Sequence, residues 1–321
     1  MVAPAVSETW HGDGPAPVSI PSVDSPIELL KTVRRQTLWW VRDRFPNRAV
    51  VRDVQGVRLV LPWSHRLPDY AGPGSPYGQN LVDLARLLAK ASPPLTVLDV
   101  GANVGDSALQ ILNAADGRVL CIEADTYYLD FLHRNVDADD RITVVESLLA
   151  VDEAAAATTA VRTGGTTRFV KGDEPDAMPS ISPEALLAAH PDFADLRLVK
   201  SDTDGYDVAL VPAIARAWSA ARPVLFFEYD PYLTRKAGYD PATVWTRLEE
   251  IGYGEAAVWN QSASVIGRMT VTEAAERSRE LDDFPARRPN HRTYWDVALV
   301  HDEDVAGRAV LDQLVPRSSN R

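Results

Sequence analysis

The glycine-rich segment TVLDVGANVGDSALQIL carries the clearest chemical signal in this chain of 321 residues. An apolar run leads into Asp99, a turn follows from Gly101 to Gly105, and a helix is expected to begin at Asp106. Glycine lets the backbone adopt positive φ and lets a ligand approach closely, and the first turn of a helix has free N–H groups. In open parallel sheets, ligands bind beyond the carboxyl ends of the strands. The segment therefore predicts a nucleotide-type site.

The spacing of glycines and acids narrows the class of nucleotide. A dinucleotide site uses G-x-G-x-x-G and a P-loop ends in G-K-[ST], and neither pattern occurs between Gly101 and Gly105. Asp99 would be poorly placed beside a pyrophosphate, but it can hold a cationic or hydroxyl-bearing ligand. Glu123 ends the next expected strand, where a carboxylate can accept hydrogen bonds from both hydroxyls of a ribose. This combination favours S-adenosylmethionine over NAD.

Two further pairs of acids follow the fourth and fifth expected strands. Asp202 and Asp204 form the first pair, and Glu228 and Asp230 form the second. Because parallel strands end at one edge of the sheet, these side chains should be neighbours. A neighbouring carboxylate raises the pKa of its partner, which suits a general base that takes the proton of an alcohol. Asp202, Asp204 and Glu228 are therefore the predicted catalytic residues.

The same acids allow a second interpretation as a metal site. Carboxylates from two strand ends can hold Mg²⁺ and orient a diol. We favour metal-free base catalysis and predict no metal ligands. His65 and His291 are further candidate bases on the acceptor side. Aromatic residues that could line an acceptor pocket, or simply fill the core, are Trp63, Tyr77, Tyr229, Tyr232 and Trp259.

The elements that must position these residues alternate between strand and helix from residue 78 onward. Strands are expected at 96–100, 119–122, 142–145, 196–200, 224–228, 255–259, 263–267 and 294–300. Helices are expected at 79–91, 106–114, 126–136, 182–189, 206–217, 241–251 and 271–281. Such alternation predicts a parallel sheet covered by helices on both faces, which is a doubly wound, Rossmann-like α/β fold.

The region before residue 78 reads as an extension of that domain. Ser25, Pro26 and Glu28 predict the start of a helix. Trp39 and Trp40 widen its apolar stripe, which predicts a helix that packs against the rest of the chain or, as the alternative, a lid or a homodimer surface. A hairpin is expected at 49–61. The predicted boundaries are a flexible tail at 1–24, a helix and hairpin extension at 25–77, the main domain at 78–302 and a C-terminal tail at 303–321.

Four segments, DVGANVGDSAL, CIEAD, KSDTDGYDVAL and FFEYDP, resemble the FkbM-type methyltransferases, a branch of the class I S-adenosylmethionine-dependent enzymes. The resemblance covers about residues 78–300. The GAN-x-G element is quite specific to this branch, and its usual K-x-D-x-E-G pattern occurs here with Asp204 in the place of Glu. The resemblance implies a seven-stranded sheet whose last strand is antiparallel. It also implies methylation of oxygen, commonly on sugars or polyketide-like natural products of secondary metabolism.

The resemblance further implies roles for individual residues. The glycine turn and the helix start would wrap the amino-acid part of S-adenosylmethionine, and Glu123 would take the ribose hydroxyls. The two residues after the third strand would border the adenine, and Asp202 would lie at the methyl-donor end. The predicted cofactor-binding residues are Asp99, Gly101, Asn103, Gly105, Asp106, Ser107, Glu123, Glu146, Ser147 and Asp202.

Composition limits the partners and the compartment. Lys and Arg number 33 and Asp and Glu 45, so the formal net charge is −12, which argues against a nucleic-acid partner. Cys121 is the single cysteine, which excludes an intrachain disulfide and fits a reducing cytoplasm. The chain shows no signal-peptide pattern and no apolar run of about 20 residues. We therefore expect a cytoplasmic protein with no membrane partner.

These features favour one function over three others. The favoured function is an O-methyltransferase that acts on a hydroxyl of a small molecule. A nitrogen- or macromolecule-directed methyltransferase lacks support, because no N-P-P-[YF] motif follows the fourth strand and no basic cleft shows. A non-catalytic S-adenosylmethionine-binding protein would also keep the binding residues. An NAD-dependent dehydrogenase is disfavoured by the missing third glycine.

Overall fold

The computed structural model describes residues 26–151, 158–163, 166–171, 179–282 and 293–316. The chain divides into two compact units, Met1–Phe45 and Pro46–Arg321. The predicted tail at 1–24 lies outside the described residues.

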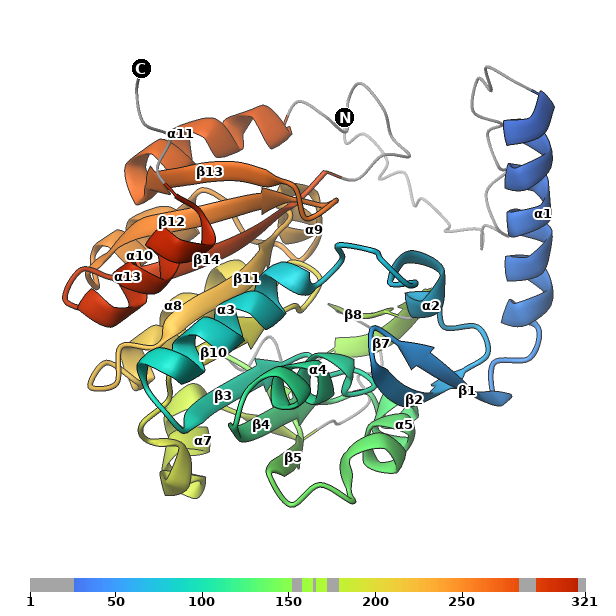
Figure 1. Ribbon diagram of the computed structural model, residues 1–321, viewed down its shortest axis with the longest axis horizontal. Coiled ribbons are helices and arrows are strands. Elements are labelled where there is room, and N and C mark those ends of the chain that lie inside the picture. Colours follow the sequence, from blue (N-terminus) through green and yellow to red (C-terminus); the bar gives the residue numbers. More distant parts are fainter. Residues whose placement is uncertain (1–25, 152–157, 164–165, 172–178, 283–292, 317–321) are drawn as a thin grey trace, which may run out of the picture. The chain divides into compact units, whose positions relative to one another are not determined.

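A single eight-stranded sheet organises the second unit (Figure 1). Its strands follow the order β13-β12-β14-β11-β10-β3-β4-β5. Their bounds are β3 (Leu95–Val100), β4 (Gly117–Glu123), β5 (Ile142–Glu146), β10 (Leu198–Ser201), β11 (Val224–Tyr229), β12 (Tyr253–Asn260), β13 (Val265–Thr270) and β14 (Trp295–His301). Neighbours from β11 to β5 pair in parallel, whereas β14, β12 and β13 add antiparallel pairings.

The sheet has one strand more than the seven that the family resemblance implies. The additional strand is β13, which corresponds to the strand expected at 263–267 and pairs with β12 as an antiparallel hairpin at the edge of the sheet. The last strand in the chain, β14, is antiparallel to its neighbour β11, as predicted. The order of the other strands, with the chain reversing direction across the sheet between β3 and β10, is that of a doubly wound α/β fold.

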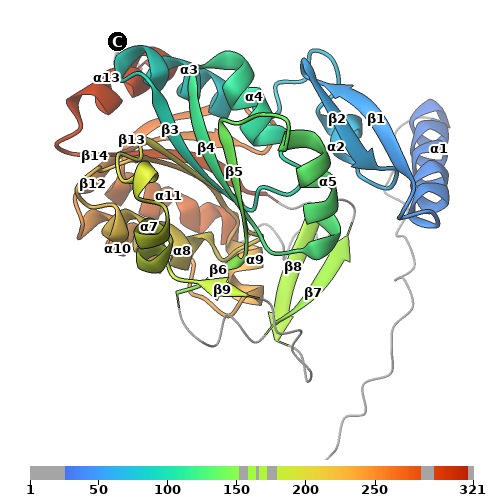
Figure 2. The ribbon, with the colours of Figure 1, turned by 90° about the horizontal axis from the view of Figure 1, so that it is seen from below.

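Helices cover both faces of the sheet, which confirms the Rossmann-like prediction (Figures 1 and 2). One face carries α3 (Gln79–Ala91), α4 (Asp106–Ala114), α5 (Thr126–Val136) and α13 (Val305–Leu314). The other carries α7 (Pro183–Ala189), α8 (Asp207–Ala217), α10 (Thr243–Glu249) and α11 (Val271–Asp282). Apolar side chains pointing from each face make one buried cluster per face, and this burial is the main stabilising contribution to the layered fold.

The helix α13 corrects the expected C-terminal boundary at residue 302. Residues 303–321 were predicted to be a tail, but Val310 and Leu311 are at most 2% exposed and pack in the same cluster as α3. Arg197 anchors the start of this helix by a bidentate contact with Asp304, at 2.6 and 3.2 Å. The sheet domain therefore continues through α13.

The predicted hairpin at 49–61 is present as β1 (Ala49–Val54) and β2 (Val57–Pro62). Leu59 and Leu61 are fully buried against Val104, Tyr128 and Phe131 from the sheet domain. The boundary predicted at residue 77 therefore divides one packed unit, which begins at Pro46. A short helix, α2 (Leu67–Tyr70), follows in the Pro- and Gly-rich loop.

Smaller elements complete the second unit. They are β6 (Leu148–Leu149), β7 (Thr158–Thr163), β8 (Thr166–Lys171), β9 (Ser180–Ile181), a 3₁₀ turn at Pro191–Phe193 and α9 (Pro231–Lys236). Strands β7 and β8 pair as an antiparallel hairpin.

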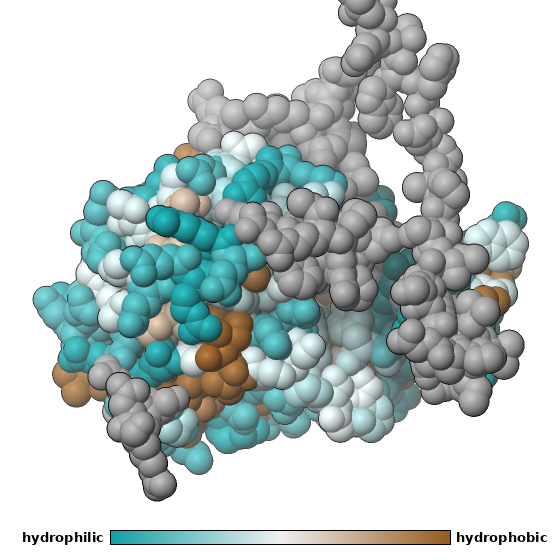
Figure 3. Space-filling model, turned by 90° about the horizontal axis from the view of Figure 1, so that it is seen from above, coloured by the Kyte–Doolittle hydropathy of each residue, from teal (hydrophilic) through white to brown (hydrophobic). Residues whose placement is uncertain are grey.

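The first unit contributes one described helix, α1 (Pro26–Asp43). Trp40 on this helix is 59% exposed, with the Arg44 guanidinium 4.3 Å from its ring centroid. A homodimer through this helix stays a prediction. In the part of the chain that the structure describes, no helix has the length and apolar character needed to cross a membrane. In the view of Figure 3, the coloured surface is mostly hydrophilic, with hydrophobic residues between hydrophilic ones.

Candidate active site

A cleft with a cavity volume of about 190 Å³ opens where β3, β4, β10 and β11 end. This is the edge at which a doubly wound sheet binds its ligands. The sequence-predicted residues that line it are Gly101, Asn103, Asp106, Ser107, Glu123, Ser147, Asp202, Asp204 and Glu228. Asp99, Gly105 and Glu146 do not line it. The structure thus brings together residues from four separate strand ends.

The glycine turn has the backbone conformation that its sequence suggests. Gly101 has φ +74° and Asn103 φ +51°. The N–H groups of Gly101 and Ala102 donate to the carbonyl of Ile122, at 3.0 and 3.1 Å, and so tie the turn to the end of β4. A Cβ on Gly101 would lie 2.2 Å from the carbonyl oxygen of Asp202. Only glycine lets these two chain segments meet.

Gly105 has a different role from the predicted one. Its φ is +84°, and a Cβ there would lie 2.8 Å from Leu132 and from Val136 on α5. It is needed for close packing between two helices rather than for contact with a ligand. The helix α4 begins directly after it.

Asp99 lies beneath the cleft as the partner of Lys200. Asp99 is fully buried, and the Nζ of Lys200 is 3.1 Å from its Oδ1 and 3.0 Å from the carbonyl of Gly101. Burial lowers the pKa of Lys200, but Asp99 and Asp202 outweigh this effect and the net shift is upward. Lys200 therefore stays charged at neutral pH and supports the turn, and Asp99 acts through it.

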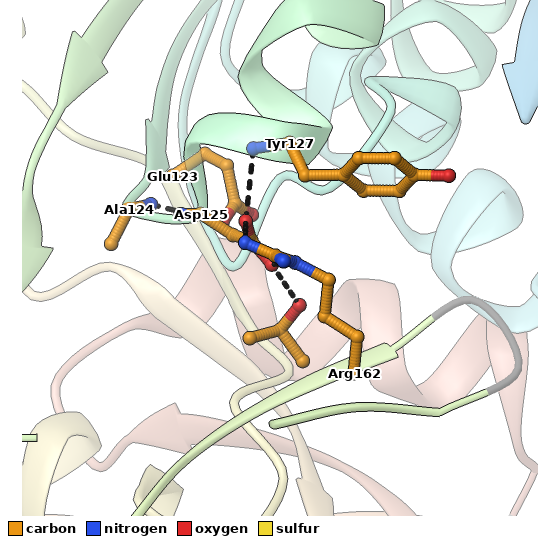
Figure 4. A network of polar contacts seen from close by, with 6 residues as sticks. Glu123, Ala124, Asp125, Tyr127 and Arg162 are labelled. Atoms are coloured by element: carbon orange, nitrogen blue, oxygen red, sulfur yellow. Dashed lines mark hydrogen bonds and ion pairs between the residues drawn. The ribbon is translucent and has the colours of Figure 1, made fainter. Parts of the chain in front are cut away.

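Glu123 joins the end of β4 to the glycine turn. Its Oε2 accepts from the N–H of Asn103 at 2.8 Å, and its Oε1 accepts from Ala124 and Asp125 at 2.9 and 2.8 Å (Figure 4). Burial raises the pKa of Glu123, and these backbone hydrogen bonds oppose the rise. Each carboxylate oxygen has two lone pairs, so the group keeps acceptor capacity for a ligand in the cleft.

His65 is positioned by hydrogen bonds at both ring nitrogens. Its Nδ1 accepts from the N–H of Leu67 at 3.2 Å, which places the ring hydrogen on Nε2. That Nε2 lies 3.1 Å from Oδ1 of Asn103, to which it donates. His65 is only 4% exposed and lines the cleft. It thus fixes the side chain of Asn103. The other candidate, His291, lies outside the described residues.

Glu146 and Ser147, the two residues predicted to border the adenine, lie in different surroundings. Glu146 is exposed, and its carboxylate contacts Nε2 of His133 at 3.2 Å on the surface of α5. Ser147 is 6% exposed and lines the cleft, and its hydroxyl donates to the carbonyl of Pro179 at 2.9 Å. Ser147, and not Glu146, borders the space beside β4.

A network that the sequence did not suggest connects the β7–β8 hairpin to this space (Figure 4). Asp125 is 1% exposed, and both its oxygens are 2.6 Å from the guanidinium of Arg162. The hydroxyl of Thr167 also donates to Asp125, and Thr167 lines the cleft. The N–H of Tyr127 donates to Asp125 at 2.9 Å. The hairpin is therefore attached to the residue two positions after Glu123.

The turn after β10 is organised by Asp207. Its Oδ1 accepts from the hydroxyl of Ser201 at 2.6 Å, and its Oδ2 accepts from the N–H groups of Thr203 and Gly205 at 3.3 and 3.4 Å. Burial raises the pKa of Asp207 to about 6. These bonds hold Asp202 and Asp204 at the cleft, so Asp204 does not serve as the cap of α8.

The opposite end of the cleft contains acids and aromatic residues. Asp296, at the start of β14, was not singled out from the sequence, yet it lines the cleft together with Glu228. The Nδ2 of Asn80 donates to Oδ2 of Asp296 at 2.8 Å. Burial, with a smaller contribution from Asp202, raises the pKa of Asp296 to about 7, and the Asn80 bond opposes the rise. Burial likewise raises the pKa of Asp106 to about 6.

The aromatic wall of this end differs from the predicted set. Of the expected residues only Tyr77 lines the cleft, where Tyr70 and Tyr294 join it. The rings of Tyr70 and Tyr77 meet edge to face at 4.7 Å. Tyr229 and Trp259 fill the core, Tyr232 is 39% exposed, and Trp63 stacks with Arg48 outside the cleft. Among the described residues, no group of three or more His, Cys, Asp or Glu side chains is arranged to hold a metal ion.

Comparison with known proteins gives only distant similarity. No family model matches the sequence, and no curated protein matches it. Among solved structures, the chain is similar to the N-terminal domain of EvdMO1, crystallised in the presence of SAH and D-fucose, with 12% identity, 83% of this chain and 96% of that chain covered, and a TM-score of 0.38.

Two further solved structures show a similar degree of likeness. Precorrin-6y C5,15-methyltransferase from Geobacter metallireducens GS-15 has 15% identity, with 69% and 87% of the two chains covered and a TM-score of 0.37. TYW2 of P. horikoshii, in complex with MeSAdo, has 13% identity, with 78% and 71% covered and a TM-score of 0.36. Similarity this distant assigns neither a family nor a substrate, so the function must be argued from the cleft itself.

Proposed function

We propose that this protein is an S-adenosylmethionine-dependent O-methyltransferase of the FkbM type that acts on a hydroxyl of a small molecule, such as a sugar or a polyketide-type product. The observation that carries the proposal is that Gly101 and Glu123, at the ends of the paired strands β3 and β4, line the same cleft as Asp202 and Glu228. A secondary-metabolic role, a cytoplasmic location and the absence of nucleic-acid or membrane partners are part of the same proposal.

The residues of the cleft fit the three chemical parts of S-adenosylmethionine. Glu123 offers carboxylate oxygens to a ribose diol, and Ile122, Leu148 and Leu149 give an apolar surface for an adenine ring. The start of α4, with Ser107, offers N–H groups to a carboxylate. When bound, the cofactor supplies a methyl group on a sulfonium, whose positive charge suits a cleft rich in carboxylates.

The chain's own residues would then perform positioning and proton transfer. Holding an acceptor hydroxyl in line with the methyl group can contribute about 7–11 kcal/mol of barrier lowering. Asp202, Asp204 and Glu228 line the cleft and are candidates to bind the acceptor hydroxyls or accept a proton. The aromatic rings of Tyr70 and Tyr77 would exclude water from the acceptor.

Isothermal titration with S-adenosylhomocysteine tests the proposal, with NAD⁺ as the contrasting ligand. We expect micromolar affinity for S-adenosylhomocysteine and none for NAD⁺. Glu123→Gln should weaken binding about tenfold or more, because the neutral amide loses the charge-assisted hydrogen bond that the carboxylate offers to a ribose hydroxyl. Glu146→Gln is the matched control, since its exposed carboxylate lies outside the cleft. Binding of NAD⁺ instead, or equal affinity in the Glu123 variant, would contradict the proposal.

Turnover is tested with S-adenosylmethionine that carries a deuterated methyl group, supplied with a panel of methyl glycosides, phenols and hydroxylated lactones. Mass spectrometry then detects the labelled ether, with and without added Mg²⁺. Labelled products from hydroxyl acceptors support O-methylation. Products confined to amines, or to protein or RNA, would favour the alternative of a nitrogen- or macromolecule-directed enzyme, and cofactor binding without any product would favour a non-catalytic binding protein.

A further inference from the structure

Strand β14, which runs antiparallel to β11, places the carboxylate of Asp296 at the cleft. Because β14 is antiparallel to β11, its first residues lie at the edge where the parallel strands end. Asp296 is the register partner of Glu228, and side chains of register partners lie on the same face of a sheet. Both residues line the cleft. Two acids therefore stand side by side at the end of the cleft that faces the predicted methyl donor.

A second element holds Asp296 in place. Asn80, in the first turn of α3, is 6% exposed and donates to Oδ2 of Asp296 at 2.8 Å. The backbone N–H of Leu81 donates to the Oδ1 of Asn80 at 3.0 Å, which fixes the orientation of the amide. The carboxylate of Asp296 is thus held by a buried amide and also lines the cleft. This arrangement suits a ligand-binding group, because an acid with only a packing role would not need to be exposed to the cavity.

The charges around Asp296 favour proton uptake near neutral pH. Asp202 comes from the turn after β10 and Glu228 from β11, while Tyr294 precedes Asp296 and itself interacts with Glu228, Asp202 and Tyr70. Lys200 is paired with Asp99 below the turn. Burial thus raises the pKa of Asp296 to about 7, which is where a general base is most effective at physiological pH.

We propose that Asp296 is the catalytic base of the methyl transfer, an inference that rests on the proposed function. The hydroxyl oxygen of the acceptor forms a bond to the methyl carbon as the carbon–sulfur bond breaks and the sulfur keeps the electron pair. The proton of that hydroxyl goes to the carboxylate of Asp296. Asn80 is a positioning residue that holds the accepting group, and Glu228 and Asp202 bind neighbouring hydroxyls of the acceptor.

A binding experiment tests the location of Asp296 without a known acceptor. Sinefungin carries an ammonium-bearing carbon where S-adenosylhomocysteine carries a neutral sulfur. Isothermal titration of both ligands between pH 5.5 and 8.5 gives the ratio of their affinities. As Asp296 ionises, the affinity for sinefungin relative to that for S-adenosylhomocysteine should rise about tenfold, because a carboxylate near the cation contributes a Coulombic attraction of that order. We call this rise near pH 7 the step.

Three variants show which side chain causes the pH-dependent rise in the affinity ratio. Asp296→Asn should abolish the step near pH 7 and keep its affinity for S-adenosylhomocysteine, since the new amide oxygen can still accept from Asn80. Asp106→Asn, which removes the other cleft acid that titrates near neutrality, should keep that step. Asn80→Ala should move the step to higher pH, because the bond that stabilises the ionised carboxylate is lost.

The outcomes separate the two proposals. If neither ligand binds the wild-type protein, the proposed function fails. If both bind and the step survives in Asp296→Asn, the proposed function stands and Asp296 does not face the reacting centre. With any acceptor found in the panel, kcat should follow the same pH inflection and fall about 100-fold or more in Asp296→Asn, whereas a fall of less than threefold would overturn the assignment.

Discussion

Lys200 and Asp99 form a buried ion pair directly beneath the glycine turn, with Nζ 3.1 Å from Oδ1. The same Nζ donates to the carbonyl of Gly101 at 3.0 Å. Lys200 lines the cleft and Asp99 does not, and through the Gly101 contact the pair supports the shape of the turn. A cation at this place also offsets the acids that line the cleft above it.

We predict that Lys200→Met destabilises the protein by about 3–5 kcal/mol, because it leaves the carboxylate of Asp99 buried without a partner. The double variant Lys200→Met with Asp99→Leu should recover part of this loss, since neither charge then remains. Urea unfolding at pH 7 measures both. Lys90→Met, at the exposed end of α3, is the control and should change the free energy of unfolding by no more than about 0.5 kcal/mol. A double variant less stable than the single one would argue against this account.

Gly101→Ala should damage both stability and cofactor binding. Its positive φ alone costs an alanine about 1–2 kcal/mol, and the new Cβ would lie 2.2 Å from the carbonyl of Asp202. Separation of the two segments would then disturb Asp202 and Asn103 together. Gly238→Ala is a matched control, because Gly238 has φ +90° with no heavy atom within 4 Å of its Cβ position. Similar losses of S-adenosylhomocysteine affinity in both variants would remove the steric argument.

The predictable part of the site is the part built from strand ends. Gly101 and Glu123 follow apolar runs that read as neighbouring parallel strands, so the topology alone places them at one edge. Asp99 and Glu146 lie equally close to strand ends, but Asp99 is buried against Lys200 and Glu146 contacts His133, so neither lines the cleft. The position of a residue in the sequence indicates which strand end it occupies. The direction of its side chain depends on packing against the helices.

The missed residues have a common physical origin. Asp296 lies inside the strand expected at 294–300, but its place at the cleft follows only when that strand is known to be in register with Glu228. Arg162 lies 37 residues from Asp125 in a polar stretch with no periodic pattern. The helix α13 was predicted to be a tail, although six of its ten residues are apolar, namely Val305, Ala306, Ala309, Val310, Leu311 and Leu314. Long-range pairings of this kind have no local signal in one sequence.

Loss of the Arg162 guanidinium should release the β7–β8 hairpin from the cleft. Arg162→Ala removes two hydrogen bonds to Asp125, and Thr167 then loses the attachment that keeps its hydroxyl at the cavity. We expect dissociation of S-adenosylhomocysteine to become about tenfold faster, with a smaller change in the association rate. Stopped-flow fluorescence measures both rates.

Two further variants show whether the geometry of this contact matters. Arg162→Lys should restore only part of the effect, because a lysine cannot make the bidentate contact. Arg86→Ala removes an exposed ion pair with Asp83 on α3 and should leave the rates unchanged. Unchanged dissociation in Arg162→Ala would mean that the hairpin does not retain the ligand.

The stability of the ligand-free protein should fall as pH rises through the range set by the cleft acids. Burial raises the pKa of Asp106 to about 6 and that of Asp296 to about 7, from an ordinary value of 3.8. Between these values the folded state binds more protons than the unfolded state, so the free energy of unfolding decreases with increasing pH. This contribution is complete below pH 4 and is lost above pH 7.

Substitution by the uncharged amide isolates this effect from other titrating groups. The difference in Tm between Asp296→Asn and the wild type should become more positive from pH 4.5 to pH 8, because the variant has no carboxylate to ionise in the cleft. Glu273→Gln should show the opposite sign, since hydrogen bonds from Thr270 lower the pKa of Glu273 and favour its ionised form. Scanning calorimetry at both pH values measures these differences. A Tm difference for Asp296→Asn that stays constant with pH would show that this carboxyl titrates at its ordinary value.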